Sequence, residues 1–154
     1  MRIVLALVAV MVLTLGALFW TGPVATTAQA AGAGTADIVA GERIYAESCA
    51  SCHGANLEGQ ANWQSPDADG MLPAPPHDET GHTWHHADGL LFEYTKLGGA
   101  VLMQRMGIEM ESGMPGFGDR LTDAQIHDVL AFIKSTWPDR IRDIQAERTR
   151  AEGQ

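Results

Sequence analysis

The sequence shows almost no alternation of apolar and polar residues with the period of two that strands require. That absence argues against a sheet-based fold. The apolar residues recur instead at the helical spacings of three and four. With 154 residues, of which 45% are hydrophobic, the chain is long enough for one compact domain but not comfortably for two. The sequence therefore predicts a single all-α domain.

Basic residues are scarce relative to acidic ones. The chain has 10 Lys and Arg against 19 Asp and Glu, a net charge of −9. No block of acidic residues stands out, so solubility alone is one explanation of this charge. The other is that the acidic surface favours partner proteins with basic faces and raises their rate of encounter. An acidic surface also repels nucleic acid and anionic lipid, so we expect neither as a partner of the folded part.

Acidic residues are entirely missing from the first thirty positions. Met1-Arg2 forms a short basic start, residues 3–20 form an apolar run, and Ala28-Gln29-Ala30 offers small residues for a signal peptidase. The pattern predicts export to the periplasmic side of the cytoplasmic membrane. Cleavage near Ala30 would release a soluble protein. An apolar run that approaches the length of a bilayer span could instead stay as a membrane anchor, with residues 31–35 as a linker.

Three helices are predicted in the remainder of the chain. The first covers residues 36–48, with Asp37 available to cap its N-terminus. The second covers 87–97 and has a natural stop at Gly98-Gly99. The third begins at a capping box, Thr122 to Gln125, and ends before Pro138. Residues 138–154 form a charged C-terminal extension in which we expect a short solvated helix without chemistry.

The segment from Gly54 to His86 is rich in Gly, Pro, Asp and His and is too long for an ordinary connection. Such a loop is usually functional or wraps around something.

The only two cysteines lie in Cys49-Ala50-Ser51-Cys52-His53, directly after the first predicted helix. In this C-x-x-C-H pattern two thiols about one turn apart can each add to a haem vinyl group. The adjacent imidazole can then bind the iron. The motif predicts one covalently attached haem c held by Cys49 and Cys52, with His53 as the first axial ligand.

Other readings of the two cysteines need weighing. They could form a disulfide, act as a thioredoxin-like redox pair, or bind zinc together with two of the six histidines. The first two need no histidine at position 53. A redox pair would also need a βαβ context, for which the chain shows no strands. Haem remains the favoured reading.

A second axial ligand is available at Met114. It lies in Ser112-Gly113-Met114-Pro115-Gly116, an irregular loop shaped by glycine and proline just ahead of the third helix. A thioether is a soft neutral ligand suited to an iron that cycles between two oxidation states. A buried structural methionine is the alternative. Three competitors follow a helical spacing typical of a packing stripe: Met103, Met106 and Met110.

Over residues 36–137 the chain resembles the class I c-type cytochromes of the bacterial monohaem kind, and is similar to the cytochrome domains of terminal-oxidase subunits. The matching elements are Gly41 and Tyr45 in the first helix, the Cys49 to Gly54 motif, Gly113-Met114-Pro115, and the last helix with Leu130 to Ile133. The resemblance implies that the first and last helices cross around one haem, with Phe132 packed at Gly41.

The resemblance also implies supporting residues. A proline carbonyl should accept a hydrogen bond from the ligand imidazole, and Pro75 and Pro76 are the matches. They follow a longer loop than the simplest members have, which leaves the choice between the two open. The histidine-rich run 77–86 is a departure from the family. It could hold copper or zinc, although its spacing fits no closed ligand set, or donate hydrogen bonds to haem propionates, with Trp84 as the expected donor. The favoured interpretation is that its histidines are mostly exposed loop or helix-cap residues.

The ligand set predicts a function. With His53 and Met114 occupying both axial positions, none is left for a substrate, so we expect a single-electron carrier of a respiratory chain rather than an enzyme. Its partners would be redox proteins, with membrane association through residues 3–20. If Met114 were not a ligand, a haem peroxidase or gas sensor would fit. Without haem, a metal chaperone using the cysteines and histidines would fit.

Overall fold

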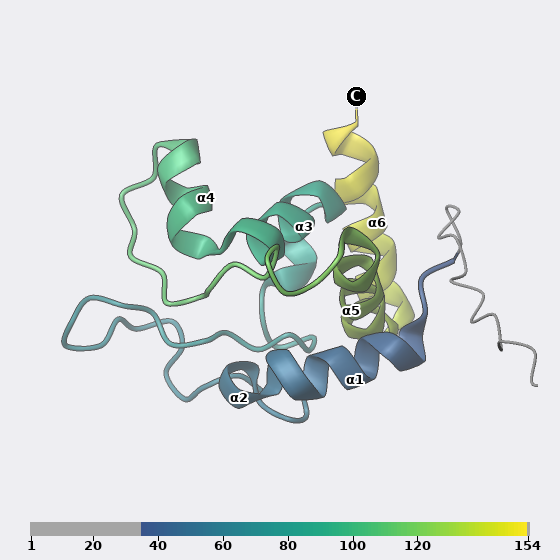
Figure 1. Ribbon diagram of the computed structural model, residues 1–154, viewed down its shortest axis with the longest axis horizontal. Helices are drawn as coiled ribbons and strands as arrows, with labels where there is room; N and C mark the ends of the chain where they lie inside the picture. Colours follow the sequence, from purple (N-terminus) through teal and green to yellow (C-terminus); the bar gives the residue numbers. More distant parts are fainter. Residues whose placement is uncertain (1–34, 154) are drawn as a thin grey trace, which may run out of the picture. The chain divides into compact units, whose positions relative to one another are not determined.

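The computed structural model describes residues 35–153. Within them the chain is helical and has no strand, as the sequence predicted (Figure 1). The elements are α1 (Ile38–Ser48), α2 (Ala50–His53), the short 3-10 helix η1 (Thr83–His85), α3 (Asp88–Leu97), α4 (Gly99–Met106), α5 (Asp123–Ser135) and α6 (Asp139–Glu152). The apolar run 3–20 and the cleavage site near Ala30 lie outside the described residues. None of the described helices is long and apolar enough to cross a membrane.

Helices α1 and α5 cross at close range, as expected (Figure 1). A Cβ atom at Gly41 would lie 2.1 Å from the carbonyl oxygen of Asp128, so only glycine allows this approach. The ring of Phe132 packs beside the crossing, with its centroid 5.5 Å from that of Tyr45. The junction starts at Asp37, which caps α1 by accepting from the Ala40 N–H and whose own N–H donates to the Asp128 carboxylate at 2.8 Å.

The predicted capping box begins α5. The Thr122 side chain accepts from the Gln125 N–H, and the Gln125 side chain accepts from the Thr122 N–H. One face of the helix then enters the core, where Trp137, just beyond its end, is also buried. The buried positions of α5 are Ile126, Val129, Leu130 and Ile133.

The region after α3 differs from the prediction. Gly98, at φ 84°, ends α3 as expected, but a new helix, α4, begins at the next residue. Its position Leu102 is buried, whereas Met106 and Met110 are exposed and Met103 is half-buried. The three methionines therefore form no stripe packed into the protein core, because the buried side chain of α4 is Leu102 and Met110 lies beyond the end of the helix.

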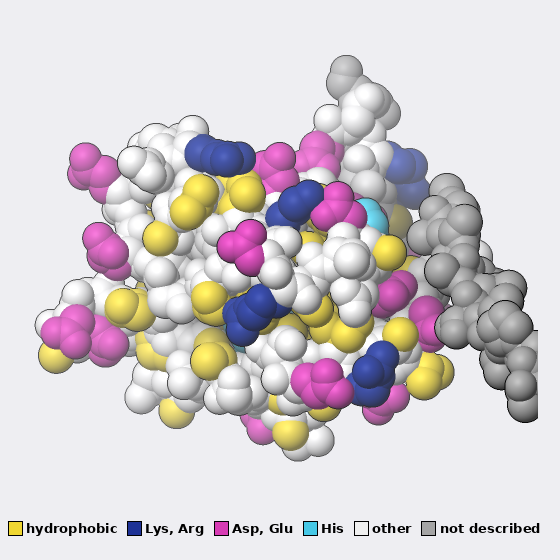
Figure 2. All heavy atoms as spheres, viewed as in Figure 1, with side chains coloured by type: hydrophobic (Ala, Val, Ile, Leu, Met, Phe, Trp, Pro, Cys, Tyr) yellow, Lys and Arg dark blue, Asp and Glu magenta, His cyan; other side chains and the backbone are white. Residues whose placement is uncertain are grey.

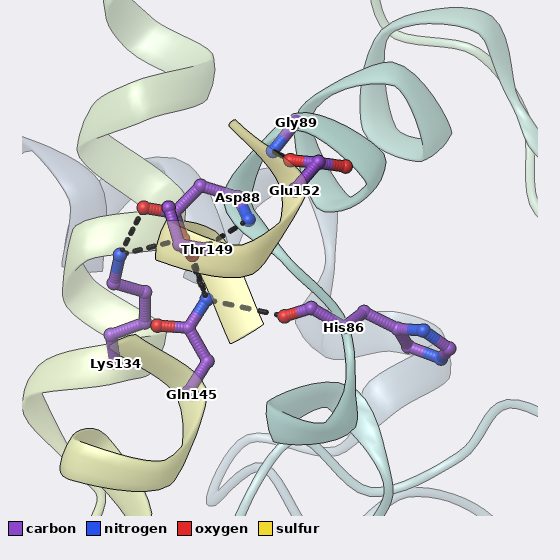
Figure 3. A network of polar contacts seen from close by, with 7 residues as sticks. All are labelled: His86, Asp88, Gly89, Lys134, Gln145, Thr149 and Glu152. Atoms are coloured by element: carbon purple, nitrogen blue, oxygen red, sulfur yellow. Dashed lines mark hydrogen bonds and ion pairs between the residues drawn. The ribbon is translucent and has the colours of Figure 1, made fainter. Parts of the chain in front are cut away.

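The C-terminal extension is a helix, but it is not simply solvated. Helix α6 packs against η1 and α3, and its Gln145 is 2% exposed. The Gln145 amide donates to the His86 carbonyl, the Asp88 carboxylate and the Thr149 hydroxyl (Figure 3). Lys134 of α5 pairs with the same Asp88 at 2.8 Å. A half-buried polar junction with Gln145 at its centre therefore joins α6 to the rest of the fold, and the charged sequence of the extension gave no sign of it.

Candidate functional site

The cysteine motif follows α1 without a loop. The Cys49 N–H donates to Tyr45 O at the end of α1, and α2 then carries the motif through one turn to Gly54, whose φ of 83° ends it. Both cysteines are free thiols: Cys49 is half-buried and Cys52 is exposed. Burial, followed by the neighbouring Cys52, raises the pKa of Cys49 to about 11. A redox pair of the thioredoxin type needs a lowered thiol pKa, so this environment does not suit that reading.

The imidazole of His53 is buried and directed by one hydrogen bond. Its Nδ1 lies 2.8 Å from the carbonyl oxygen of Pro75, which singles out that proline from its neighbour Pro76. A carbonyl can only accept, so Nδ1 must carry the proton. Burial lowers the pKa of His53, which keeps the ring neutral, while the Pro75 bond opposes that shift. The lone pair of Nε2 is then available to bind a metal.

The hydroxyl of Tyr45 holds the end of the motif in place. It donates to the Gly54 carbonyl at 2.9 Å and lies 3.3 Å from the His53 carbonyl. Burial, and then the nearby Cys49 and acidic side chains, raises the pKa of Tyr45 well above its usual value. The phenol thus stays protonated and remains a donor.

A second imidazole, which the sequence analysis did not single out, lies against the first. The ring of His77 stacks on that of His53 with centroids 4.0 Å apart and planes at 23°. Its Nδ1 is 2.8 Å from the Thr83 hydroxyl. Burial, followed by His53 and His82, lowers the pKa of His77 well below its usual value. Its place directly after Pro75-Pro76 was the only sequence signal for this position.

Met114 lies in the loop between α4 and α5, and the main chain of that loop is fastened to the end of α3. The Met114 carbonyl accepts from the Gly99 N–H at 3.0 Å. Beyond it, the N–H groups of Phe117 and Gly118 donate to the carbonyls of Thr95 and Lys96. The Met114 side chain is half-buried. Among the residues that the structure describes, no hydrogen bond connects Met114 with His53. The loop path is therefore set by backbone bonds, as its glycines and proline suggested.

Exposed apolar side chains occur on α4, on the loop after it and in the loop of Met71, and Figure 2 shows apolar atoms scattered over the visible face of the molecule. A single exposed apolar side chain is unremarkable, but a group of this kind marks a surface that another group covers. A porphyrin is such a group. The residues are Met71, Leu72, Val101, Met106, Ile108 and Met110.

The residues present therefore fit a covalently held haem. Two free thiols stand on one turn, the adjacent imidazole has its Nε2 lone pair available, and apolar surface lies beside a methionine loop. Cys49 and Cys52 would hold the ring, and His53 would bind the iron.

Trp84 makes its contacts within the histidine-rich run. The indole N–H of Trp84 donates to the Glu79 carbonyl at 3.3 Å, and its ring stacks on His85 at 3.7 Å. The expected role of Trp84 toward a propionate stays a prediction, and that N–H would have to leave its present acceptor. Within the part of the chain that the structure describes, no three His, Cys, Asp or Glu side chains converge in a metal-binding group.

A family model described as Cytochrome c matches residues 38–137. Comparisons with curated proteins and with solved structures gave no match. The match begins at the first residue of α1 and ends at Trp137, so it contains the crossing helices, the cysteine motif and Met114. Members of this family carry covalently bound haem c and generally transfer electrons rather than act as enzymes. Since the match covers well over half of the 154 residues, the chain belongs to the cytochrome c family and is a haem-based electron-transfer protein.

Proposed function

We propose that the chain carries one haem c, bound axially by His53 and Met114, and works as a single-electron carrier of a respiratory chain, as a class I cytochrome of the bacterial monohaem kind. The observation that carries this proposal is the 2.8 Å contact between His53 Nδ1 and the Pro75 carbonyl, which leaves Nε2 as the metal-binding atom. The two cysteines of the chain provide one attachment motif, which supports a single haem.

The residues of the chain have separate tasks in this function. Bound haem supplies a one-electron iron couple. His53 and Met114 together fill both axial positions, so the chain leaves none open for oxygen or peroxide. The apolar side chains around α4 exclude water, and a neutral thioether ligand and burial both favour the reduced state. Pro75 and Tyr45 fix the imidazole and its peptide so that little moves when the charge changes.

The place of the protein in the cell is part of the same proposal. The N-terminal pattern supports a location on the periplasmic side of the cytoplasmic membrane, either as a soluble protein cleaved near Ala30 or anchored by residues 3–20. Its donor and acceptor would be redox proteins. The net charge of −9 favours basic partner faces and short-lived encounters. Comparing the mass of the protein in membrane and soluble fractions tests the processing.

A haemochrome assay in pyridine tests the attachment. Protein made in a host with haem-attachment machinery should give one haem per chain, with the spectrum of two thioether bonds. The control is a Cys49→Ala, Cys52→Ala double variant, which should retain no haem after denaturation. Colourless wild-type protein would contradict the proposal and leave a metal chaperone as the better reading.

Substitution of the proposed distal ligand tests the ligation. Met114→Ala should lose the red charge-transfer band of methionine ligation and lower the midpoint potential by a sizeable part of the ~0.8 V that axial ligands span. Met110→Ala, at a competing methionine of the same region, is the matched control and should keep the charge-transfer band. If Met114→Ala kept the wild-type spectrum, or if the wild-type protein took up carbon monoxide readily, a peroxidase or gas sensor would replace the electron carrier.

A further inference from the structure

The segment that follows the two prolines is held from two sides by its main chain. The N–H of His77 donates to the Leu57 carbonyl at 2.8 Å, in the loop just after the cysteine motif. The His77 carbonyl accepts from the indole N–H of Trp137 at 2.7 Å, at the end of α5. Trp137 is itself 2% exposed. The backbone of His77 is therefore tied both to the haem-binding motif and to the core.

The side chain of His77 is fixed as firmly as its backbone. Its Nδ1 meets the hydroxyl of Thr83, a buried residue of η1, at 2.8 Å. Its ring lies face to face with the ring of His53, with centroids 4.0 Å apart and planes at 23°. On another side the ring of Tyr45 presents an edge, with centroids 6.2 Å apart. Such packing leaves the imidazole of His77 one orientation.

The hydrogen bond from His53 to Pro75 restrains the plane of the His53 ring only loosely. One N–H···O contact tolerates departures of roughly 30° from linearity, so the ring can still turn to some extent about its Cβ–Cγ bond. A flat group packed against the face of the ring removes the remaining freedom. A tilt of the His53 ring would either open a gap between the two stacked rings or bring their atoms too close together. The Pro75 carbonyl and the His77 ring thus supply two different restraints on one imidazole.

We propose that His77 is a positioning residue for the haem ligand, whose stacked imidazole, held by Thr83, sets the plane of the His53 ring. The inference rests on the proposed role of His53 as axial ligand. It assigns a function to one member of a histidine run that would otherwise pass as exposed loop. His77 touches the ligand and acts through it.

Three variants distinguish the effect of the stacked ring at position 77 from the effects of its hydrogen bond to Thr83 and of its side-chain volume. His77→Phe keeps a flat ring but loses Nδ1, His77→Leu keeps apolar bulk without a flat face, and Thr83→Val removes the hydroxyl at similar volume. The matched control is His82→Leu, which changes an exposed histidine of the same run. Each ferric protein is measured by proton NMR of the haem methyl groups and by electron paramagnetic resonance, both of which respond to the plane of the ligand ring. Midpoint potential and unfolding by denaturant are measured in parallel.

The expected result is a ranked change in spectrum. His77→Leu should change the spread and the order of the chemical shifts of the haem methyl groups. It should also change the position of the electron paramagnetic resonance signal. His77→Phe should stay close to wild type, because a flat ring remains. Thr83→Val should fall between them, and His82→Leu should match wild type. Thr83→Val also keeps the test usable if His77→Leu does not fold.

Two results would overturn the inference, and they are distinguishable. If wild-type protein has the methionine-ligated spectrum but His77→Leu and Thr83→Val leave the methyl pattern unchanged, His77 is structural only. The same conclusion would follow if His77→Leu and His77→Phe both lowered the free energy of unfolding and neither changed the spectra. If the wild-type spectrum shows that His53 is not a ligand, the proposed function fails first and the inference fails with it.

Discussion

The surroundings of His53 and those of Met114 are built in different ways. Around His53 the side chain itself is restrained, by the Pro75 carbonyl and by the stacked ring of His77. Around Met114 the restraint falls on the main chain, through the Gly99 N–H, and exposed apolar side chains such as Met110 lie nearby. An imidazole has two nitrogens and a plane, so it must be both aimed and oriented. A thioether has one sulfur on a flexible stem, so a correctly routed loop is sufficient.

Substituting Gly41, on the helix that leads into the cysteine motif, and Gly99, beside the methionine loop, should give the largest difference. A Cβ at Gly41 would meet the backbone of Asp128, which cannot move without separating α1 from α5, whereas a Cβ at Gly99 would meet the side chains of Ser112 and Tyr94. We expect Gly41→Ala to lower the free energy of unfolding by about 3 kcal/mol and Gly99→Ala by about 1 kcal/mol. Denaturant unfolding of the haem-loaded proteins measures both. Equal costs would contradict the contrast between a rigid and an adaptable region.

Removing one phenol hydroxyl from each region should give the next largest difference. Tyr45→Phe removes the buried hydroxyl that donates to the Gly54 carbonyl, and we expect a loss of about 1 kcal/mol, because the Leu57 and Gly59 N–H groups still donate to the carbonyls of Gly54 and His53. Tyr94→Phe removes only a half-buried contact with Ser112, 3.0 Å long, and should cost roughly 0.5 kcal/mol. Calorimetric melting of the two variants provides the comparison. A larger cost for Tyr94→Phe would reverse the assignment of the more restrained region.

Acid should loosen the segment that carries His82 and His86 before the methionine loop. Partial burial, followed by neighbouring histidines, lowers the pKa of His82 and His86 in the folded protein. The unfolded chain therefore binds more protons once the pH falls below about 6.5, so stability decreases from pH 7 toward pH 5. Hydrogen exchange should show amides of residues 74–86 losing protection before those of 112–118. His82→Gln and His86→Gln should flatten the dependence, and an unchanged slope in the double variant would refute this origin.

The smallest effect is expected from an exposed ion pair on the methionine side. Lys96 and Asp123 lie 2.7 Å apart with the lysine 37% and the aspartate 61% exposed. Lys96→Met should change the free energy of unfolding by less than about 0.5 kcal/mol, and raising the salt concentration should shrink the difference further. Urea titration at two salt concentrations checks this. A cost above that of Tyr45→Phe would show that side-chain pairing stabilises this region more than its backbone bonds do.

Local signals in the sequence were sufficient for three helices. The Asp37 cap, the glycine stop after Leu97 and the capping box at Thr122 are each read from a few neighbouring residues, and the structure confirms all three boundaries to within two residues. Helix α4 was not predicted, because the Gly98-Gly99 pair at which it begins is also a typical signal for the end of the preceding helix, α3. The burial of Gln145 in α6 was missed because its partners are distant in the chain.

In the candidate site, too, features that depend on neighbouring residues could be predicted, whereas those that depend on contacts between distant residues could not. The cysteine motif and the Met114 loop are contiguous in sequence and could be proposed directly. The choice of Pro75 over Pro76 depends on the path of a long loop, which brings one carbonyl to His53 from 22 residues away. The stacking of His77 depends on the same path and on Trp137, 60 residues further on. Neither has a local signature, so only the folded chain reveals them.

The fastening of Asp37 has a mechanical consequence. Its N–H donates a hydrogen bond to the Asp128 carboxylate of α5, and its own carboxylate caps the first turn of α1. A pull on the chain ahead of Asp37 would thus be taken up by the α1 and α5 pair and spread into the core. The turn that carries Cys52 and His53 lies at the opposite end of α1, shielded from that load.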